Sequence, residues 1–148
     1  MKKKIMPPTY LMVLLILLIG AHLIIPVKKI IFPPYSYLGW ILVAIGVFLN
    51  LWVDFKFKKK GTTIKSYNLP SKFITSGAYK ISRHPVYLGM LMILLGTAII
   101  LGSAISFIFP IIFVILTEYL FISTEEKNME RVFGKKYLDY KKKVRRWI

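Results

Sequence analysis

The sequence predicts an all-α integral membrane protein with four transmembrane helices, a long polar loop and a helical C-terminal tail. Of the 148 residues, 56% are hydrophobic, above the about 45–50% usual in soluble domains, and they gather in blocks. Basic segments alternate with these blocks and give a net charge of +16. A chain of this length and pattern is expected to form a single membrane domain.

The apolar blocks define the expected spans, which are residues 10–25, 35–53, 86–101 and 104–122. A basic start precedes the first block, as in a signal peptide, but no small-x-small cleavage site follows, so we expect a retained helix. Pro33 and Pro34 end the connection to the second block, because proline cannot continue a helix. The polar loop then covers residues 55–85, and the tail covers residues 123–148.

The distribution of lysine and arginine predicts the orientation. With the N-terminus in the cytoplasm, every Lys and Arg except Lys28 and Lys29 lies on the cytoplasmic side. The positive-inside rule therefore predicts that both termini are cytoplasmic, and it brings the loop and the tail to the same face. The positive charge is better explained by this topology and by anionic lipid headgroups than by nucleic acid.

Apolar and aromatic residues in the tail recur at steps of four and three, which predicts one helical face. They are Met129, Phe133, Tyr137, Tyr140, Val144 and Trp147. Gly134 predicts a break between two tail helices, since glycine commonly ends a helix. Ser123 or Thr124 could cap the first of these helices, or the fourth span could continue through them.

Several common kinds of site have no counterpart in the sequence. There is no cysteine, and the two histidines, His22 and His84, are far apart, so a metal site is not expected. A phosphate-binding glycine loop, an HExxH motif and a Ser-His-Asp order are also missing, which gives hydrolysis little support.

The polar chemistry is concentrated between Ser71 and Gly89 and near the end of the fourth span. The candidate side chains are Tyr79, Arg83, His84, Tyr87, Glu118, Glu125 and Glu126. A helix start at His84-Pro85 offers N–H groups to an anion, tyrosine faces attract cations, and carboxylates suit an ammonium or hydroxyl group. Together these groups could hold a zwitterionic cofactor with a cationic centre. The alternative is an ordinary capped helix start with interfacial tyrosines and salt bridges.

Five blocks in the second half of the chain keep a characteristic order and spacing. They are Thr75-Ser-Gly-Ala-Tyr79, Arg83-His-Pro-Val-Tyr-Leu-Gly89, Glu125-Glu126, Phe133-Gly-Lys-Lys-Tyr137-Leu-Asp-Tyr140 and, after Val144, Arg146-Trp-Ile148. Over roughly residues 60–148 this arrangement resembles the isoprenylcysteine carboxyl methyltransferase family and its phospholipid methyltransferase relatives, as a short member of prokaryotic type.

The resemblance implies an integral membrane enzyme that uses S-adenosylmethionine to methylate a lipophilic acceptor at the cytoplasmic face. It implies cofactor contacts from Ser71, Lys72, Phe73, Ile74, Tyr79, His84, Pro85, Val86, Tyr87 and Glu125. Within this set we expect Tyr79 or Tyr87 to face the sulfonium and the helix start to take the methionine carboxylate. Glu125 is expected to take an ammonium or a hydroxyl group.

Phe121 departs from the family pattern. In the eukaryotic carboxyl methyltransferases a substrate-binding arginine lies four residues before the glutamate matched by Glu125, and here that position is Phe121. A prenylcysteine carboxylate is therefore in doubt as the acceptor, and an uncharged or amine lipid fits equally well. Glu118 is a candidate substrate contact only for a protonated amine; otherwise it is expected to pair with a Lys or Arg.

Methyl displacement needs alignment and exclusion of water more than an acid or base, so the sequence assigns no general base. Two other functions stay open at this point. One is a phospholipid or amine N-methyltransferase. The other is a non-catalytic basic membrane protein whose loop and tail bind anionic lipid.

Overall fold

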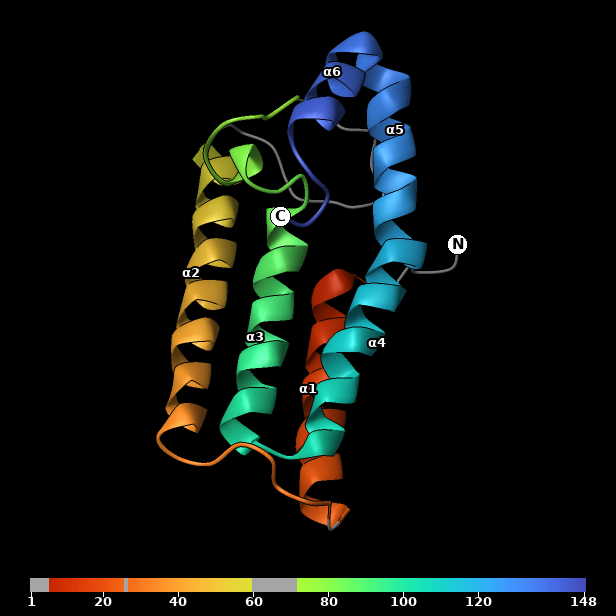
Figure 1. Cartoon of the computed structure of the whole chain (residues 1–148). Coiled ribbons are helices and arrows are strands. Elements are labelled where there is room, and N and C mark those ends of the chain that lie inside the picture. The colour runs from red at the N-terminus through yellow and green to blue at the C-terminus, as the bar shows by residue number, and fades with distance from the viewer. Residues whose placement is uncertain (1–5, 26, 60–71) are drawn as a thin grey trace.

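The computed structural model describes residues 6–25, 27–59 and 72–148, and over these ranges the chain is helical with no strand (Figure 1). The α-helices are α1 (Pro7–Ile24), α2 (Leu38–Lys59), α3 (Pro85–Leu101), α4 (Ile108–Thr117), α5 (Ser123–Phe133) and α6 (Lys135–Lys143). The shorter elements are the 3-10 turns η1 (Tyr35–Tyr37), η2 (Gly77–Lys80) and η3 (Ala104–Phe107), and a π-helical turn, η4 (Glu118–Ile122).

Three helical stretches of the described chain are long and apolar enough to cross a membrane, namely Pro7–Ile24, Tyr35–Lys59 and Ala104–Phe133. The apolar helix α3, with 17 residues, lies among them and is shorter. These helices support a multi-pass membrane protein, while the count of four spans and the orientation remain predictions. In the third stretch the apolar residues end at Ile122, so we treat α5 as lying beyond the membrane.

Glycine contacts join α2 closely to α3. Gly39 and Gly46 of α2 face Gly96 and Gly89 of α3, and a Cβ atom built at Gly46 would lie 2.5 Å from the carbonyl oxygen of Gly89. A side chain at either glycine of α2 would therefore force the helices apart. This close packing fixes the position of the α3 start along α2.

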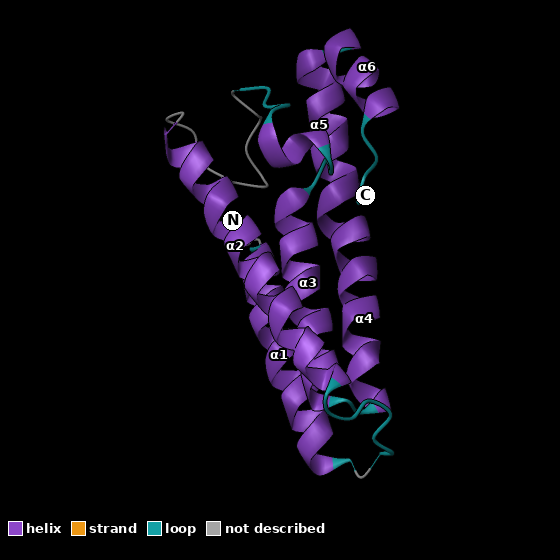
Figure 2. Cartoon of the chain, turned by 60° about the vertical axis from the view of Figure 1, so that its left-hand side comes forward, coloured by secondary structure: helices purple, strands orange, loops and turns teal. Residues whose placement is uncertain are grey.

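The first tail helix continues the fourth apolar stretch without a break. The hydroxyl of Ser123 donates to the carbonyl of Glu118 at 2.9 Å, across the π-helical turn, so Ser123 does not cap a new helix. The predicted break at Gly134 is confirmed, since this residue has φ +51° between α5 and α6. In Figures 1 and 2, α5 extends past the start of α3, and α6 folds back beside α5.

Helix α2 extends beyond Val53, the expected end of the second span. Helix α2 continues to Lys59, so the first residues of the expected loop are helical. Asp54 and Lys58 form an i,i+4 ion pair at 2.6 Å, and the basic residues of the last turn suit the negative end of the helix dipole.

Candidate functional site

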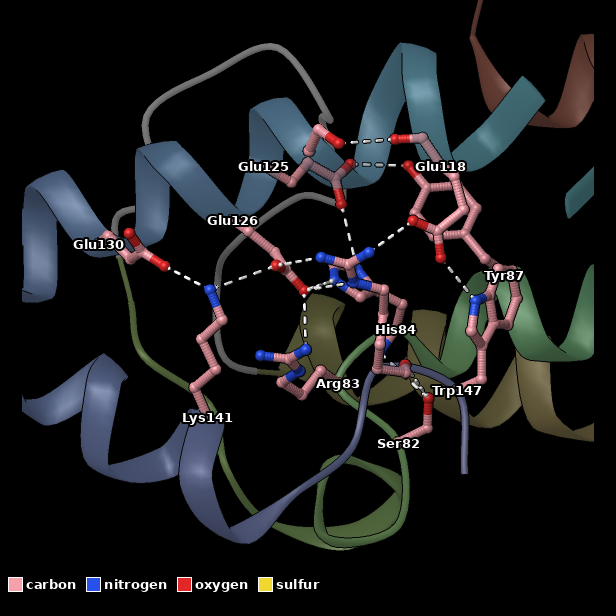
Figure 3. A network of polar contacts seen from close by, with 12 residues as sticks. Ser82, Arg83, His84, Tyr87, Glu118, Glu125, Glu126, Glu130, Lys141 and Trp147 are labelled. Carbon is pink, nitrogen blue, oxygen red and sulfur yellow. Dashed lines mark hydrogen bonds and ion pairs between the residues drawn. The ribbon is translucent and has the colours of Figure 1, made fainter. Parts of the chain in front are cut away.

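The start of α3, the α4–α5 helix and the C-terminal segment meet at one end of the bundle (Figure 3). The backbone N–H of Arg83 donates to the carbonyl of Arg145 at 3.0 Å. The hydroxyl of Ser82 donates to the carbonyl of Arg146 at 3.1 Å and accepts from the N–H of His84 at 3.1 Å. These bonds hold the returning C-terminus against the segment that begins α3.

Glu126 lies at the centre of this cluster and is 4% exposed. Its carboxylate contacts the guanidinium groups of Arg83 at 3.2 Å and Arg146 at 2.9 Å, and the Nε2 atom of His84 at 3.4 Å. Burial alone would raise the pKa of Glu126. The hydrogen bonds with His84 and Arg146, and the positive charges of Arg83 and Arg146, outweigh burial and lower this pKa well below its usual range. Glu126 is therefore a buried carboxylate anion that ties the three segments together.

His84 lies between two carboxylates at the start of α3. Its Nδ1 and Nε2 atoms each lie 3.4 Å from a carboxylate oxygen, of Glu125 and Glu126 respectively. Burial alone would lower the pKa of His84, but the hydrogen bonds and charges of the two glutamates outweigh it and raise the pKa above its ordinary value. This arrangement favours the imidazolium form.

Glu125 is the more accessible of the two neighbouring glutamates. Its side chain is 22% exposed, against 5% for that of Glu126. The hydroxyl of Tyr87 donates to Glu125 at 2.7 Å, and His84 approaches its other oxygen. The first turn of α3 thus orients the Glu125 carboxylate and leaves it partly open to a ligand.

Arg83 has hydrogen-bonding capacity that the described residues do not use. Its side chain is 8% exposed, and its Nη2 atom contacts Glu126. The Nε and Nη1 atoms are buried and have no hydrogen-bond partner within the described ranges. Buried donors are almost always paired in folded proteins, and leaving one unpaired is costly. Within the described chain, these donors of Arg83 are available to an anionic or carbonyl group.

An aromatic cluster joins the loop to the tail. Phe73 stacks on Phe133 at 5.1 Å between ring centroids and meets the edge of Tyr140 at 5.5 Å. The hydroxyl of Tyr140 donates to the carbonyl of Tyr79. Burial raises the pKa of Tyr79, and the charge of Glu125 adds to this rise, so the Tyr79 hydroxyl lies within the field of the site. The described end of the loop, residues 72–84, therefore contacts the tail.

Glu118 and Phe121 have partners within the protein. Glu118 accepts from Arg146 at 2.6 Å and from the indole N–H of Trp147 at 2.8 Å, so the expected pairing with an arginine is confirmed. Phe121 is 2% exposed and packs between Tyr10 at 5.5 Å and Tyr87 at 6.2 Å. Phe121 thus fills the core directly beside the site.

The predicted cofactor residues are placed unevenly. His84, Tyr87 and Glu125 are in direct contact, and Tyr79 lies close to them. Among the others, Ile74 and Pro85 are buried, and Val86 is partly buried against the core. Phe73 belongs to the aromatic cluster, and Lys72 is exposed. Ser71 lies outside the described residues. Sequence reasoning gave no role to four residues of the network, namely Ser82, Lys141, Arg146 and Trp147.

The chain was compared with known families and proteins. Residues 35–136 match the model of the phospholipid methyltransferase family. A methanethiol S-methyltransferase of Crocosphaera subtropica is 30% identical over 126 residues, which cover 80% of this chain and 46% of the relative. A methanethiol S-methyltransferase of Pseudomonas deceptionensis is 31% identical over 111 residues, which cover 73% of this chain and 41% of the relative.

A plant protein gives a shorter match. Protein-S-isoprenylcysteine O-methyltransferase B of Arabidopsis thaliana is 36% identical over 76 residues, which cover 49% of this chain and 37% of the relative. The chain thus spans less than half the length of each of these three relatives. No solved structure matches it significantly. The family match includes both the start of α3 and the Glu125-Glu126 pair, and on this evidence the chain belongs to the phospholipid methyltransferase family.

Proposed function

We propose that this protein is an S-adenosylmethionine-dependent methyltransferase that acts on a lipophilic acceptor at the cytoplasmic face of the membrane. One observation carries the proposal: the buried guanidinium of Arg83, with two unpartnered nitrogens among the described residues, lies in the same network as the partly exposed carboxylate of Glu125. A site with unused guanidinium donors and a partly exposed carboxylate suits a zwitterionic ligand.

The residues present fit this cofactor. The Nε and Nη1 donors of Arg83 suit its carboxylate, because hydrogen bonds from a guanidinium to a carboxylate are charge-assisted. Glu125 suits its ammonium group or a ribose hydroxyl. Tyr79 is the better aromatic partner for the sulfonium, since the ring of Tyr87 already packs against His84 and Phe121. When bound, the cofactor supplies a methyl group activated by the positive charge on sulfur.

The chain's own contribution is to bind, orient and exclude water. The bond from Tyr87 holds Glu125 in place, and Glu126 holds His84, Arg83 and Arg146 in one arrangement. The described end of the loop packs against the tail beside the start of α3, and this burial favours a displacement reaction that needs alignment and exclusion of water. These residues give no proton-transfer role to any side chain.

The acceptor is more consistent with a sulfur or amine nucleophile than with a carboxylate. The buried Phe121 stands where a substrate-binding arginine would be needed, and the nearby Arg146 is already paired with Glu118 and Glu126. Relatives that align with about three quarters of this chain include methanethiol S-methyltransferases and probable protein-S-isoprenylcysteine O-methyltransferases, so a thiol is favoured only when the relatives are taken together with Phe121 and Arg146. The family description favours the second candidate, N-methylation of a phospholipid or other amine.

Cofactor binding tests the proposal directly. S-adenosylhomocysteine, titrated into the purified chain in detergent, is expected to bind saturably, and Glu125→Gln should weaken binding about tenfold through loss of a charge-assisted contact. Arg83→Lys keeps the charge but lacks the Nε and Nη1 donors at their fixed positions, so it should weaken binding similarly. Glu130→Gln is the matched control, since Glu130 lies farther along α5 and pairs with Lys141. Absence of saturable binding would refute the proposal and favour the non-catalytic lipid-binding protein.

The acceptor is identified by product analysis. The chain is incubated with S-adenosylmethionine labelled in its methyl group and with methanethiol, a prenylcysteine or phosphatidylethanolamine. Label in a thioether supports the thiol, label in a base-stable amine supports the second candidate, and a base-labile methyl ester contradicts the reasoning from Phe121 and Arg146.

The cytoplasmic placement rests on the distribution of Lys and Arg, and a labelling experiment tests it. Because the chain contains no cysteine, a single cysteine can be placed at Lys28 or at Lys143. In intact cells a membrane-impermeant maleimide is expected to label Lys28→Cys and spare Lys143→Cys. The reverse pattern would overturn the orientation.

A further inference from the structure

A groove of about 250 Å³ opens on the side of the bundle where α2 meets the start of α3. Its lining is apolar except for one serine and consists of Leu49, Trp52, Gly77, Ala78, Ile81, Ser82, Pro85 and Leu88. The groove therefore lies at the level where the apolar part of α2 gives way to its basic last turn. In a membrane protein this is the level of the lipid headgroups.

A lysine without a carboxylate partner lies at the wall of this groove. The Nζ atom of Lys56 sits 4.6 Å from the centre of the Trp52 ring and directly against Gly77, where it would collide with any side chain. Within the described chain Lys56 makes no ion pair, whereas Lys58, on the same turn, pairs with Asp54 at 2.6 Å. The groove thus combines an apolar floor with one unneutralised positive charge.

We propose that this groove binds an anionic phospholipid, with part of an acyl chain against Trp52 and the headgroup phosphate at Lys56. Charge complementarity selects this occupant. A soluble anion would leave the apolar lining exposed to water, and a zwitterionic phospholipid would bring its own ammonium group close to Lys56 together with its phosphate. Tryptophan and lysine are both favoured at the membrane interface, where anionic headgroups attract basic side chains.

The groove adjoins the proposed cofactor site through Ser82 and Pro85 but opens on another face of α3. Pro85 and Leu88 are three residues apart and share the face of α3 that lines the groove. Tyr87 instead packs against Phe121 and contacts Glu125 on α5. A lipid in the groove would therefore leave the cofactor residues accessible, and its binding can be measured without cofactor.

Native mass spectrometry of the full chain, delipidated in detergent, tests the proposal with dioleoyl phosphatidylglycerol and dioleoyl phosphatidylcholine. The wild type is expected to prefer phosphatidylglycerol about fivefold, the effect of one basic residue near an anionic surface. Lys56→Gln should abolish this preference, and Lys56→Arg should keep it. Lys59→Gln is the matched control, because Lys59 is exposed on the same helix and does not line the groove. Leu49→Trp fills the groove and should weaken the binding of both lipids about tenfold. This loss corresponds to the contribution of roughly two buried methylene groups.

Circular dichroism and thermal unfolding in the same detergent establish that each variant is folded. The proposal is overturned if folded Lys56→Gln keeps the wild-type preference, or if Leu49→Trp binds both lipids as the wild type does. Equal affinity of the wild type for the two lipids would also overturn it and would leave the groove as a site for acyl chains of any lipid.

Discussion

Replacing Glu126 by glutamine is expected to destabilise the protein by about 3–5 kcal/mol, the cost of leaving a buried charge without its partner. The Glu126 carboxylate is 4% exposed and, within the described chain, is the carboxylate that pairs with the guanidinium of Arg83, at 3.2 Å. The side chain of Arg83 is itself only 8% exposed, so water cannot replace the lost partner. Glutamine keeps the size and one acceptor oxygen, so the loss reports on the charge. Unfolding by sodium dodecyl sulfate in mixed micelles, followed by circular dichroism, measures it.

Two further variants make the result interpretable. Glu130→Gln removes a carboxylate one turn later on α5, where the side chain is 36% exposed and pairs with Lys141 at 2.7 Å, and it should cost less than about 1 kcal/mol. In the double variant, Arg83→Met removes the guanidinium charge that Glu126→Gln leaves unpaired. The double variant should therefore recover part of the lost free energy of unfolding. An exposed ion pair contributes up to about 1 kcal/mol. If the free energies of unfolding of Glu126→Gln and Glu130→Gln differ by less than about this amount, the buried network does not stabilise the tail.

Three other predictions concern pH, helix packing and the tail break. The pKa of His84 is raised above its ordinary value of 6.5, so its stabilising contribution is complete below that pH and is lost as pH rises through the folded-state pKa. His84→Gln should flatten this decline in detergent unfolding measured across pH, and an unchanged decline would contradict the assignment. Gly46→Ala should cost about 1–3 kcal/mol by overpacking against the backbone of α3, whereas Gly20→Ala, with nothing within 4 Å, should be neutral or slightly stabilising in the same assay. Gly134→Ala places a side chain at φ +51° with no contact within 4 Å, so it should cost about 1–2 kcal/mol of conformational strain. The same variant should speed hydrogen exchange in α6. Equal exchange rates in the variant and the wild type would show that the break does not require glycine.

The helices follow from the sequence because hydropathy and helix-ending residues are local signals. The apolar blocks, the start of α3 at Pro85 and the break at Gly134 were all predicted. The end of α2 was not, because the lysines after Val53 resemble a loop in composition. They continue the helix instead, since the end of an apolar block marks the membrane boundary and not the end of helical hydrogen bonding.

The site was only partly predictable for a different reason. His84, Tyr87 and Glu125 belong to blocks whose order and spacing carry a family resemblance, and they do meet. The contacts of Arg146 and Trp147 with Glu118 join residues 28 and 29 positions apart and depend on the path of the chain through α6. No local pattern in the sequence encodes such a return. The helix start expected to bind an anion through its N–H groups also carries the His84 imidazole between two carboxylates.

The balance of charges in the cluster gives the strongest reason to regard it as a binding site. Glu118 is paired with Arg146, and Glu126 is paired with Arg146 and Arg83, so these two carboxylates are neutralised within the protein. Arg83 still has two buried nitrogens without partners among the described residues, and Glu125 is still partly exposed. A purely structural salt-bridge network would gain stability by satisfying these donors, because unpaired buried donors are costly. Within the described chain, these donors beside an accessible carboxylate support the proposed site for a zwitterion over an ordinary interfacial network.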